Sequence, residues 1–195
     1  MMHQEDIAKK FKHILTVVQM DKFLKMEALG GEIPFFISAY NPEQELEVSK
    51  AVGGLKNKLE TSGLKVLEMN LYSVAMEILE NELGEGEIFN LEKEMDKEEF
   101  KSALQSVLDV REVVIPALKA KIDEDKYDVY FVTGIGQVYP FLRSHNILNN
   151  LQNIAKAAPT LMFFAGIYNG QSLELFGRLK DDNYYRAFNI DNYKI

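Results

Sequence analysis

The chain has 195 residues, 47% of them hydrophobic, so it is long enough to bury one sizeable core, and we expect a single domain over 1–195. It contains no cysteine, which excludes disulfides, thiolate metal sites and a cysteine nucleophile. The net charge of −8 argues against non-specific binding to nucleic acid. The start MMHQEDIAKKF lacks the pattern of a signal peptide, and no apolar run approaches the roughly 18 residues of a membrane span. We therefore expect a cytoplasmic protein with no membrane partner.

The chain opens with a helical pattern that is followed by a strand pattern. Apolar residues spaced three and four apart between Asp6 and Leu29 predict a long helix, and Gly30-Gly31 is a suitable stop. The apolar run 33–40, IPFFISAY, is typical of a buried strand. We expect residues 1–31 to form an N-terminal helix packed on the domain.

A second helix, a second strand and a third helix follow in the same alternation. Asn41 and Pro42 are suited to begin the helix, and Gln44 is placed to complete a capping box. The next strand is predicted at 64–70, and the next helix begins at Ser73.

An acidic stretch separates the two halves of the chain. Residues 77–99 contain ten Asp or Glu and two Lys, so this window alone carries a charge of −8, and we interpret 81–99 as an acidic insertion. Asp96, with Glu99 three residues later, predicts a capping box. It would start a long helix that runs to Leu118 and is kinked at Pro116.

The second half predicts the rest of a sheet. Strands are expected at 127–132 and 160–164, with a helix at 144–158 between them, and shorter strands at 173–176 and 184–190. This alternation predicts an α/β fold with a mainly parallel sheet of about five strands and helices on both faces, Rossmann-like or degenerate P-loop-like, plus the N-terminal helix.

The turns that follow the strands argue against a phosphate site. The turn 38–43 lacks the Gly, Lys and Ser or Thr of a phosphate loop, while Pro42 removes a donor and Glu43 adds negative charge. The run Thr133-Gly134-Ile135-Gly136 is a G-x-G without the third glycine, which is a weak dinucleotide fingerprint. Glycines that permit tight backbone geometry are the better interpretation.

The helix at 144–158 carries an asparagine stripe, Asn146, Asn149, Asn150 and Asn153, whose side chains lie within about 100° of arc around the helix axis. Ordinary exposed faces favour charged residues, so the amides either bind a partner or polar ligand or bond neighbouring loops of the same chain. No Asp or Glu occurs between Val129 and Leu173, so we expect an acid-free surface there. The candidate interaction residues are Gly134, Gly136, Arg143, His145, Asn146, Asn149, Asn150 and Asn153, and the acidic stretch is a second candidate interface.

A further candidate polar site combines Arg178, Asp181, Asp182 and Arg186. Paired carboxylates can hold magnesium or share a proton, but between two short strands they are more typical of a polar turn. The three histidines are scattered, and no G-x-S-x-G occurs. We therefore expect no metal, no cofactor and no catalytic residue.

Three segments, 35–74, 131–166 and 172–190, together resemble the BrxB family, which is encoded in BREX bacteriophage-defence operons. The resemblance spans nearly the whole chain. Its most specific parts are RSHNILNNLQ at 143–152 and LFGRLKDDNYYRAFNI at 175–190.

The resemblance implies a small accessory component of a multi-protein system that also contains the alkaline-phosphatase-like PglZ, the ATPase BrxC and the methyltransferase PglX. We hypothesise a non-enzymatic adaptor that docks onto another BREX protein, PglZ first and BrxC or PglX otherwise. Without clustered Lys and Arg, high-affinity DNA binding is not expected. The alternative hypothesis is an enzyme or binding protein acting on nucleotide or nucleic acid, using Arg143, His145 and Asp181-Asp182.

Overall fold

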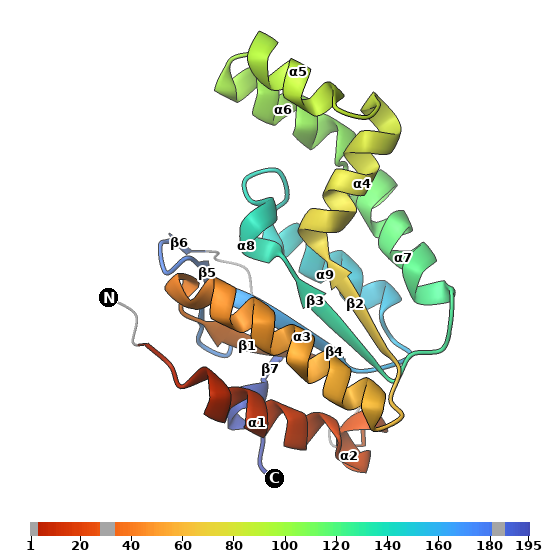
Figure 1. Cartoon of the computed structure of the whole chain (residues 1–195), viewed down its shortest axis with the longest axis vertical. Coiled ribbons are helices and arrows are strands. Elements are labelled where there is room, and N and C mark those ends of the chain that lie inside the picture. Colours follow the sequence, from red (N-terminus) through yellow and green to blue (C-terminus); the bar gives the residue numbers. More distant parts are fainter. Residues whose placement is uncertain (1–3, 28–33, 181–185) are drawn as a thin grey trace.

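The computed structural model describes residues 4–27, 34–180 and 186–195, and it confirms the predicted α/β class (Figure 1). A mainly parallel sheet has the strand order β2-β3-β4-β1-β7, and β5 and β6 extend it from β4 as antiparallel strands. The strands are β1 Phe35–Tyr40, β2 Val66–Asn70, β3 Val129–Thr133, β4 Thr160–Tyr168, β5 Leu173–Leu175, β6 Leu179–Lys180 and β7 Phe188–Asn189.

The central strands send alternate side chains into two separate cores. On β1, Phe35 and Ile37 lie in one core while Phe36 lies in the other, and on β4 Phe163 and Phe164 divide in the same way. Successive side chains of a strand point to opposite faces, so a sheet that is apolar at every position must be covered on both sides. The continuous apolar runs of the sequence are explained by this double burial.

One face of the sheet is covered by α1 Ile7–Val18 and α3 Glu45–Thr61 (Figure 1). The predicted helix to Leu29 is too long, because α1 ends at Val18 and a short helix, α2 Asp21–Leu24, follows. The break lets Phe23 turn into the core, where its ring centroid lies 4.7 Å from that of Phe36. The predicted stop at Gly30-Gly31 lies outside the described residues.

The remaining helices come from the middle of the chain, and several of them cover the other face of the sheet. They are α4 Leu71–Leu83, α5 Glu87–Glu94, α6 Lys97–Val107, the π turn η2 Val110–Val114, α7 Ile115–Asp123, α8 Ile135–Val138 and α9 Ser144–Ile154. The helices α5 and α6 lie beyond the end of α4, away from the sheet (Figure 1). The predicted acidic insertion, 81–99, therefore falls in this helical arm, in which Phe89 is exposed.

The long helix predicted from Asp96 is interrupted earlier than expected. Its capping box is confirmed, since the Asp96 carboxylate accepts the backbone N–H of Glu99 at 2.9 Å and the Glu99 side chain accepts that of Asp96 at 3.3 Å. The helix ends at Val107, however, and Asp109 starts the π turn that leads into α7. Pro116 then stands in the first turn of α7, where a missing N–H is tolerated.

The carboxyl end of β4 extends past the predicted Phe164 and turns back against β5. A Cβ at Gly166 would clash with the Glu174 carbonyl oxygen and lie 2.8 Å from Cε1 of Phe164. This close approach of two backbones requires glycine. The predicted strand at 184–190 is reduced to β7, with residues 184 and 185 outside the described part of the chain.

We predict that Gly166→Ala destabilises the fold by about 1–3 kcal/mol, because the added methyl group overpacks the β4–β5 contact. Gly54→Ala is the matched control: nothing lies within 4 Å of its Cβ position in α3, and alanine is the better helix former by about 0.5–1 kcal/mol. Urea unfolding of both variants measures the effects. A Gly166→Ala protein as stable as the wild type would contradict the clash.

Candidate functional site

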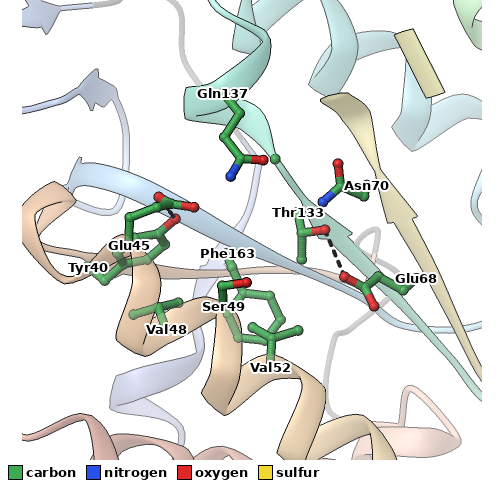
Figure 2. A pocket seen from close by; sticks show the side chains of 11 residues that line it. Tyr40, Glu45, Val48, Ser49, Val52, Glu68, Asn70, Thr133, Gln137 and Phe163 are labelled. Atoms are coloured by element: carbon green, nitrogen blue, oxygen red, sulfur yellow. Dashed lines mark hydrogen bonds between the residues drawn. The ribbon is translucent and has the colours of Figure 1, made fainter. Parts of the chain in front are cut away.

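The carboxyl edge of the sheet holds a small hollow. It lies where β1, β2 and β3 end in Tyr40, Asn70 and Thr133, which is where open parallel sheets usually bind ligands (Figure 2). Its volume of about 40 Å³ has room for a few water molecules.

Two carboxylates line this hollow but do not converge. The Tyr40 hydroxyl donates to Glu45 at 2.6 Å, and the Thr133 hydroxyl donates to Glu68 at 3.0 Å, on opposite sides of the space (Figure 2). Burial, and then the hydrogen bond to Glu45, raises the pKa of Tyr40 far above its usual value. Among the described residues that line the hollow there is no Lys or Arg, and Lys56, whose Nζ is 3.9 Å from a Glu68 carboxylate oxygen, offsets only one of the two carboxylates, so the charges disfavour a phosphate.

The two glycines after β3 have structural reasons to be there. Gly134 has a left-handed φ of 75° at the start of α8, and a Cβ there would lie 2.6 Å from Oδ1 of Asn70. A Cβ on Gly136 would lie 3.0 Å from Cε1 of Phe176. These contacts fit tight backbone packing, and the structure does not bring either glycine to the groove described next.

A larger, polar groove runs between the end of α6 and the start of α9. It has a volume of about 500 Å³ and is lined by Gln105, Leu108, Asp109, Val110, Arg111, Phe141, Arg143, Asn146 and Asn150. Three predicted interaction residues, Arg143, Asn146 and Asn150, are thus gathered in one place. Arg111 joins them from the π turn. Sequence reasoning missed Arg111, and the signal for it was its position two residues after Asp109, which caps the π turn.

Contacts between loop and helix fix the walls of the groove. Gln105 of α6 donates from Nε2 to the Pro140 carbonyl oxygen at 2.9 Å, which joins α6 to the loop before α9. The rings of Phe100 and Phe141 pack edge to face with centroids 6.2 Å apart. The opening is therefore held by a backbone-directed hydrogen bond and an aromatic contact.

Both arginines of the groove are exposed and available. Neither the Arg111 nor the Arg143 guanidinium has an ion pair or hydrogen bond within the described ranges. Asp109, the carboxylate of the groove, instead accepts the backbone N–H groups of Arg111 and Glu112 at 2.9 and 2.8 Å. The expectation of an acid-free surface is thus wrong, because folding brings Asp109 beside a segment that has no acid in its own sequence.

The asparagine stripe is partly satisfied within α9. Asn150 donates to the Asn146 carbonyl oxygen at 2.7 Å, and Asn153 donates to that of Asn149 at 3.1 Å. The bond from α9 to a neighbouring segment is made by Gln152, whose Nε2 donates to the Arg186 carbonyl oxygen at 3.1 Å. Asn146, Asn149 and Asn153 are exposed, so their amides face solvent, while His145 is half-buried at the start of the helix and outside the groove's lining.

The other predicted polar site cannot be assembled from the described residues. Arg178 and Arg186 are exposed, and Asp181 and Asp182 lie outside the described part of the chain. No group of three or more His, Cys, Asp or Glu that could hold a metal ion occurs in residues 4–27, 34–180 and 186–195. In the same ranges, no helix has the length and hydropathy needed to cross a membrane.

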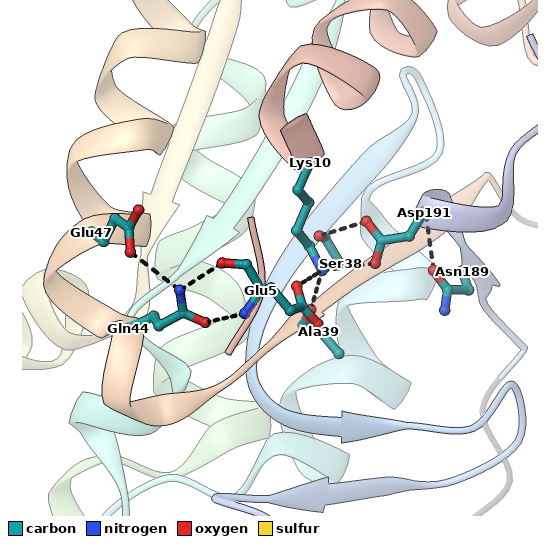
Figure 3. A network of polar contacts seen from close by, with 8 residues as sticks. All are labelled: Glu5, Lys10, Ser38, Ala39, Gln44, Glu47, Asn189 and Asp191. Atoms are coloured by element: carbon teal, nitrogen blue, oxygen red, sulfur yellow. Dashed lines mark hydrogen bonds and ion pairs between the residues drawn. The ribbon is translucent and has the colours of Figure 1, made fainter. Parts of the chain in front are cut away.

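A third polar cluster lies beside the end of β1 and joins the two ends of the chain (Figure 3). Lys10 of α1 contacts Glu5 at 2.6 Å and Asp191 at 3.0 Å, and it donates to the Ala39 carbonyl oxygen at 2.5 Å. The Ser38 hydroxyl donates to Asp191 at 3.2 Å. The Lys10 side chain is 10% exposed and its ammonium group has three acceptors, so the cluster is a structural brace rather than a reactive site.

Gln44 belongs to the same region and corrects a prediction. Its amide donates to the Glu5 carbonyl oxygen and accepts the Glu5 N–H, both at 2.9 Å (Figure 3). Asn41 alone caps the turn, by accepting the Glu43 N–H at 3.1 Å. The predicted capping box is therefore not formed, because Gln44 is recruited by the N-terminal segment.

The chain matches a family model described as "BrxB: BREX protein BrxB" over residues 67–190. A "BREX protein BrxB" from Bacillus cereus (strain H3081.97) is 34% identical over 188 residues, covering 94% of this chain and 97% of the relative. A second "BREX protein BrxB", from Escherichia coli O9:H4 (strain HS), is 30% identical over 182 residues, covering 93% and 90%. No solved structure shows a significant match.

Asp191 gives the brace a predictable pH dependence. Burial raises its pKa above the ordinary value of 3.8, although Lys10 acts in the opposite direction. The folded protein therefore binds this proton more tightly than the unfolded chain, and ionisation of Asp191 costs stability as pH rises through the folded pKa. We predict that the unfolding free energy of the wild type, relative to Asp191→Asn, increases as pH falls from 7 towards 4.

Asp125→Asn is the control for this measurement. Its hydrogen bond to Lys65 lowers the pKa of exposed Asp125, so the wild type should lose stability relative to that variant over the same acid range, and by a smaller amount. Urea unfolding at each pH gives both differences. If the unfolding free energy of the wild type relative to Asp191→Asn stayed constant or decreased as pH falls, the burial of Asp191 would not raise its pKa as described.

Proposed function

Because the chain belongs to the BrxB family of the BREX antiviral defence system, we propose that it is a non-enzymatic adaptor that docks onto another BREX protein through the groove between α6 and α9. PglZ is the first expected partner, and BrxC and PglX are the others. The observation that carries the proposal is that Arg143, which is exposed and has no ion pair within the described residues, lines the groove together with Asn146 and Asn150.

Arginine at the edge of a groove suits a docking role. Its planar guanidinium makes several oriented hydrogen bonds, and arginines of this kind often dominate the binding energy of an interface. Amide side chains next to it can bond a partner's backbone. The groove walls are already fixed by the contacts of Gln105 and Phe100, so little ordering would accompany binding.

The runner-up function, an enzyme or binding protein for nucleotide or nucleic acid, was expected to use Arg143, His145 and Asp181-Asp182, and the two aspartates lie outside the described residues. The hollow at the carboxyl edge of the sheet is the other place where such a protein would bind its ligand. That hollow is small, and its two carboxylates are each bonded to a hydroxyl on opposite sides. Catalytic carboxylates need to reach the same substrate atom. The geometry thus favours the adaptor over the enzyme.

We predict that Arg143→Ala abolishes capture of PglZ when the tagged protein is purified from its operon. Truncating an interface anchor costs about 2 kcal/mol or more, which is more than tenfold in affinity. The double variant Asn146→Ala with Asn150→Ala, both in the groove lining, should weaken capture while leaving the melting temperature unchanged, since alanine favours the helix. Lys50→Ala, an exposed change on α3, is the control.

Melting temperatures separate the outcomes of this experiment. Loss of capture with intact folding supports docking. A large fall in melting temperature for the Arg143 or asparagine variants would instead mean that these side chains brace the monomer. Unchanged folding with unchanged capture would remove the groove as the interface and direct attention to the acidic arm.

We also predict that calorimetry with ATP and magnesium gives no saturable heat, because the described lining of the hollow combines two carboxylates with no basic side chain. Micromolar binding that disappears on Thr133→Val would contradict this prediction and favour the runner-up. Binding unaffected by that change would still contradict it and would place the nucleotide elsewhere on the chain.

A further inference from the structure

We infer that the groove between α6 and α9 accepts an acidic peptide segment of the partner protein, whose carboxylates are bound by Arg111 and Arg143. This inference rests on the proposed docking function and adds the chemistry of the partner. The two arginines are 32 positions apart in the sequence and come from different elements, the π turn and the start of α9. Their meeting in one groove is therefore a product of the tertiary structure.

The charge distribution makes this pair unusual. The chain carries a net charge of −8 and has four arginines, and two of these line the same groove. In so acidic a protein an exposed guanidinium would readily find a carboxylate of its own chain, yet within the described ranges both remain without one. Two guanidinium forks that line the same groove are suited to bidentate binding of carboxylates.

The start of α9 adds to the positive potential. Arg143 occupies the N-cap position and makes no side-chain cap at the start of this 11-residue helix. The backbone N–H groups of the first helical turn carry the positive end of the helix dipole. The start of the helix therefore adds to the positive potential that the two arginines create.

Asp109 limits which anion fits. Its carboxylate lines the groove but accepts two backbone N–H groups and pairs with neither arginine, so it keeps one negative charge in the groove. A densely charged phosphate backbone would be repelled by this carboxylate and by the net charge of the chain. A peptide carries its carboxylates along an uncharged backbone. Those carboxylates can bind the two arginines, while the rest of the peptide contacts the Asn146 amide and the Phe141 ring.

The test uses fluorescein-labelled hexaglutamate, with hexaglutamine and a single-stranded oligonucleotide as comparison probes, in fluorescence anisotropy with the full chain. Hexaglutamate should bind, hexaglutamine should not, and affinity should fall as salt rises from about 50 to about 500 mM. Arg111→Ala and Arg143→Ala should each weaken binding about tenfold, and Arg111→Lys should have a partial effect because the fork is lost while the charge is kept.

Asp109→Asn supplies a change of opposite sign. Asparagine is as good an N-cap as aspartate, so the π turn should persist, but one negative charge leaves the groove. Hexaglutamate should then bind about fivefold more tightly, as expected for removal of a like charge near the surface. Lys50→Ala, on the opposite face, should leave the affinity unchanged.

Each result decides the inference. Equal binding of hexaglutamine, no effect of the arginine variants, or weaker binding in Asp109→Asn would overturn it. Tighter binding of the oligonucleotide, lost with the same arginines, would also overturn it and favour a phosphate ligand. If Arg143→Ala loses partner capture while hexaglutamate does not bind, the groove is a docking site but its partner segment is not acidic. If hexaglutamate binds while Arg143→Ala keeps partner capture, the groove binds acidic peptides but is not the docking site.

Discussion

The burial of a parallel sheet on both faces is the constraint on which the rest of this protein depends. Phe163 and Phe164, adjacent on β4, lie in different cores, so neither face of the sheet can be left in water. Helices α1 and α3 cover one face, and α4, α7 and α9 cover the other (Figure 1). Function is thereby confined to the carboxyl edge and to the outer surfaces of the covering helices.

The groove between α6 and α9 is a consequence of how the second face is covered. A continuous helix after Asp96 would have carried the chain past α9 without a turn. Asp109 caps a new turn instead, so Arg111 lines the same groove as Arg143, while Gln105 of α6 bonds the loop before α9. The same interruption thus completes the covering layer and opens a polar space at its outer edge.

The sequence by itself determined the class of fold and several local features. Continuous apolar runs such as 160–164 can be buried only in a sheet covered on both sides, which is why the α/β class was predictable. The capping box of Asp96 and Glu99 was predictable because its partners are three residues apart. Asn146 and Asn150 were singled out by their helical spacing, and Arg143 was singled out as a basic residue in a segment without acids.

Only the tertiary structure decided the features that depend on partners distant in the chain. Gln44 looked like a capping residue, but Glu5, which is 39 positions away, binds its amide. Lys10 and Asp191 meet although they lie near opposite ends of the sequence. In the same way Asp109 and Arg111 share a groove with Arg143, which lies 32 positions after Arg111 in the sequence. Helical periodicity and capping act over a few residues, whereas these contacts exist only once the sheet has brought its covering helices together.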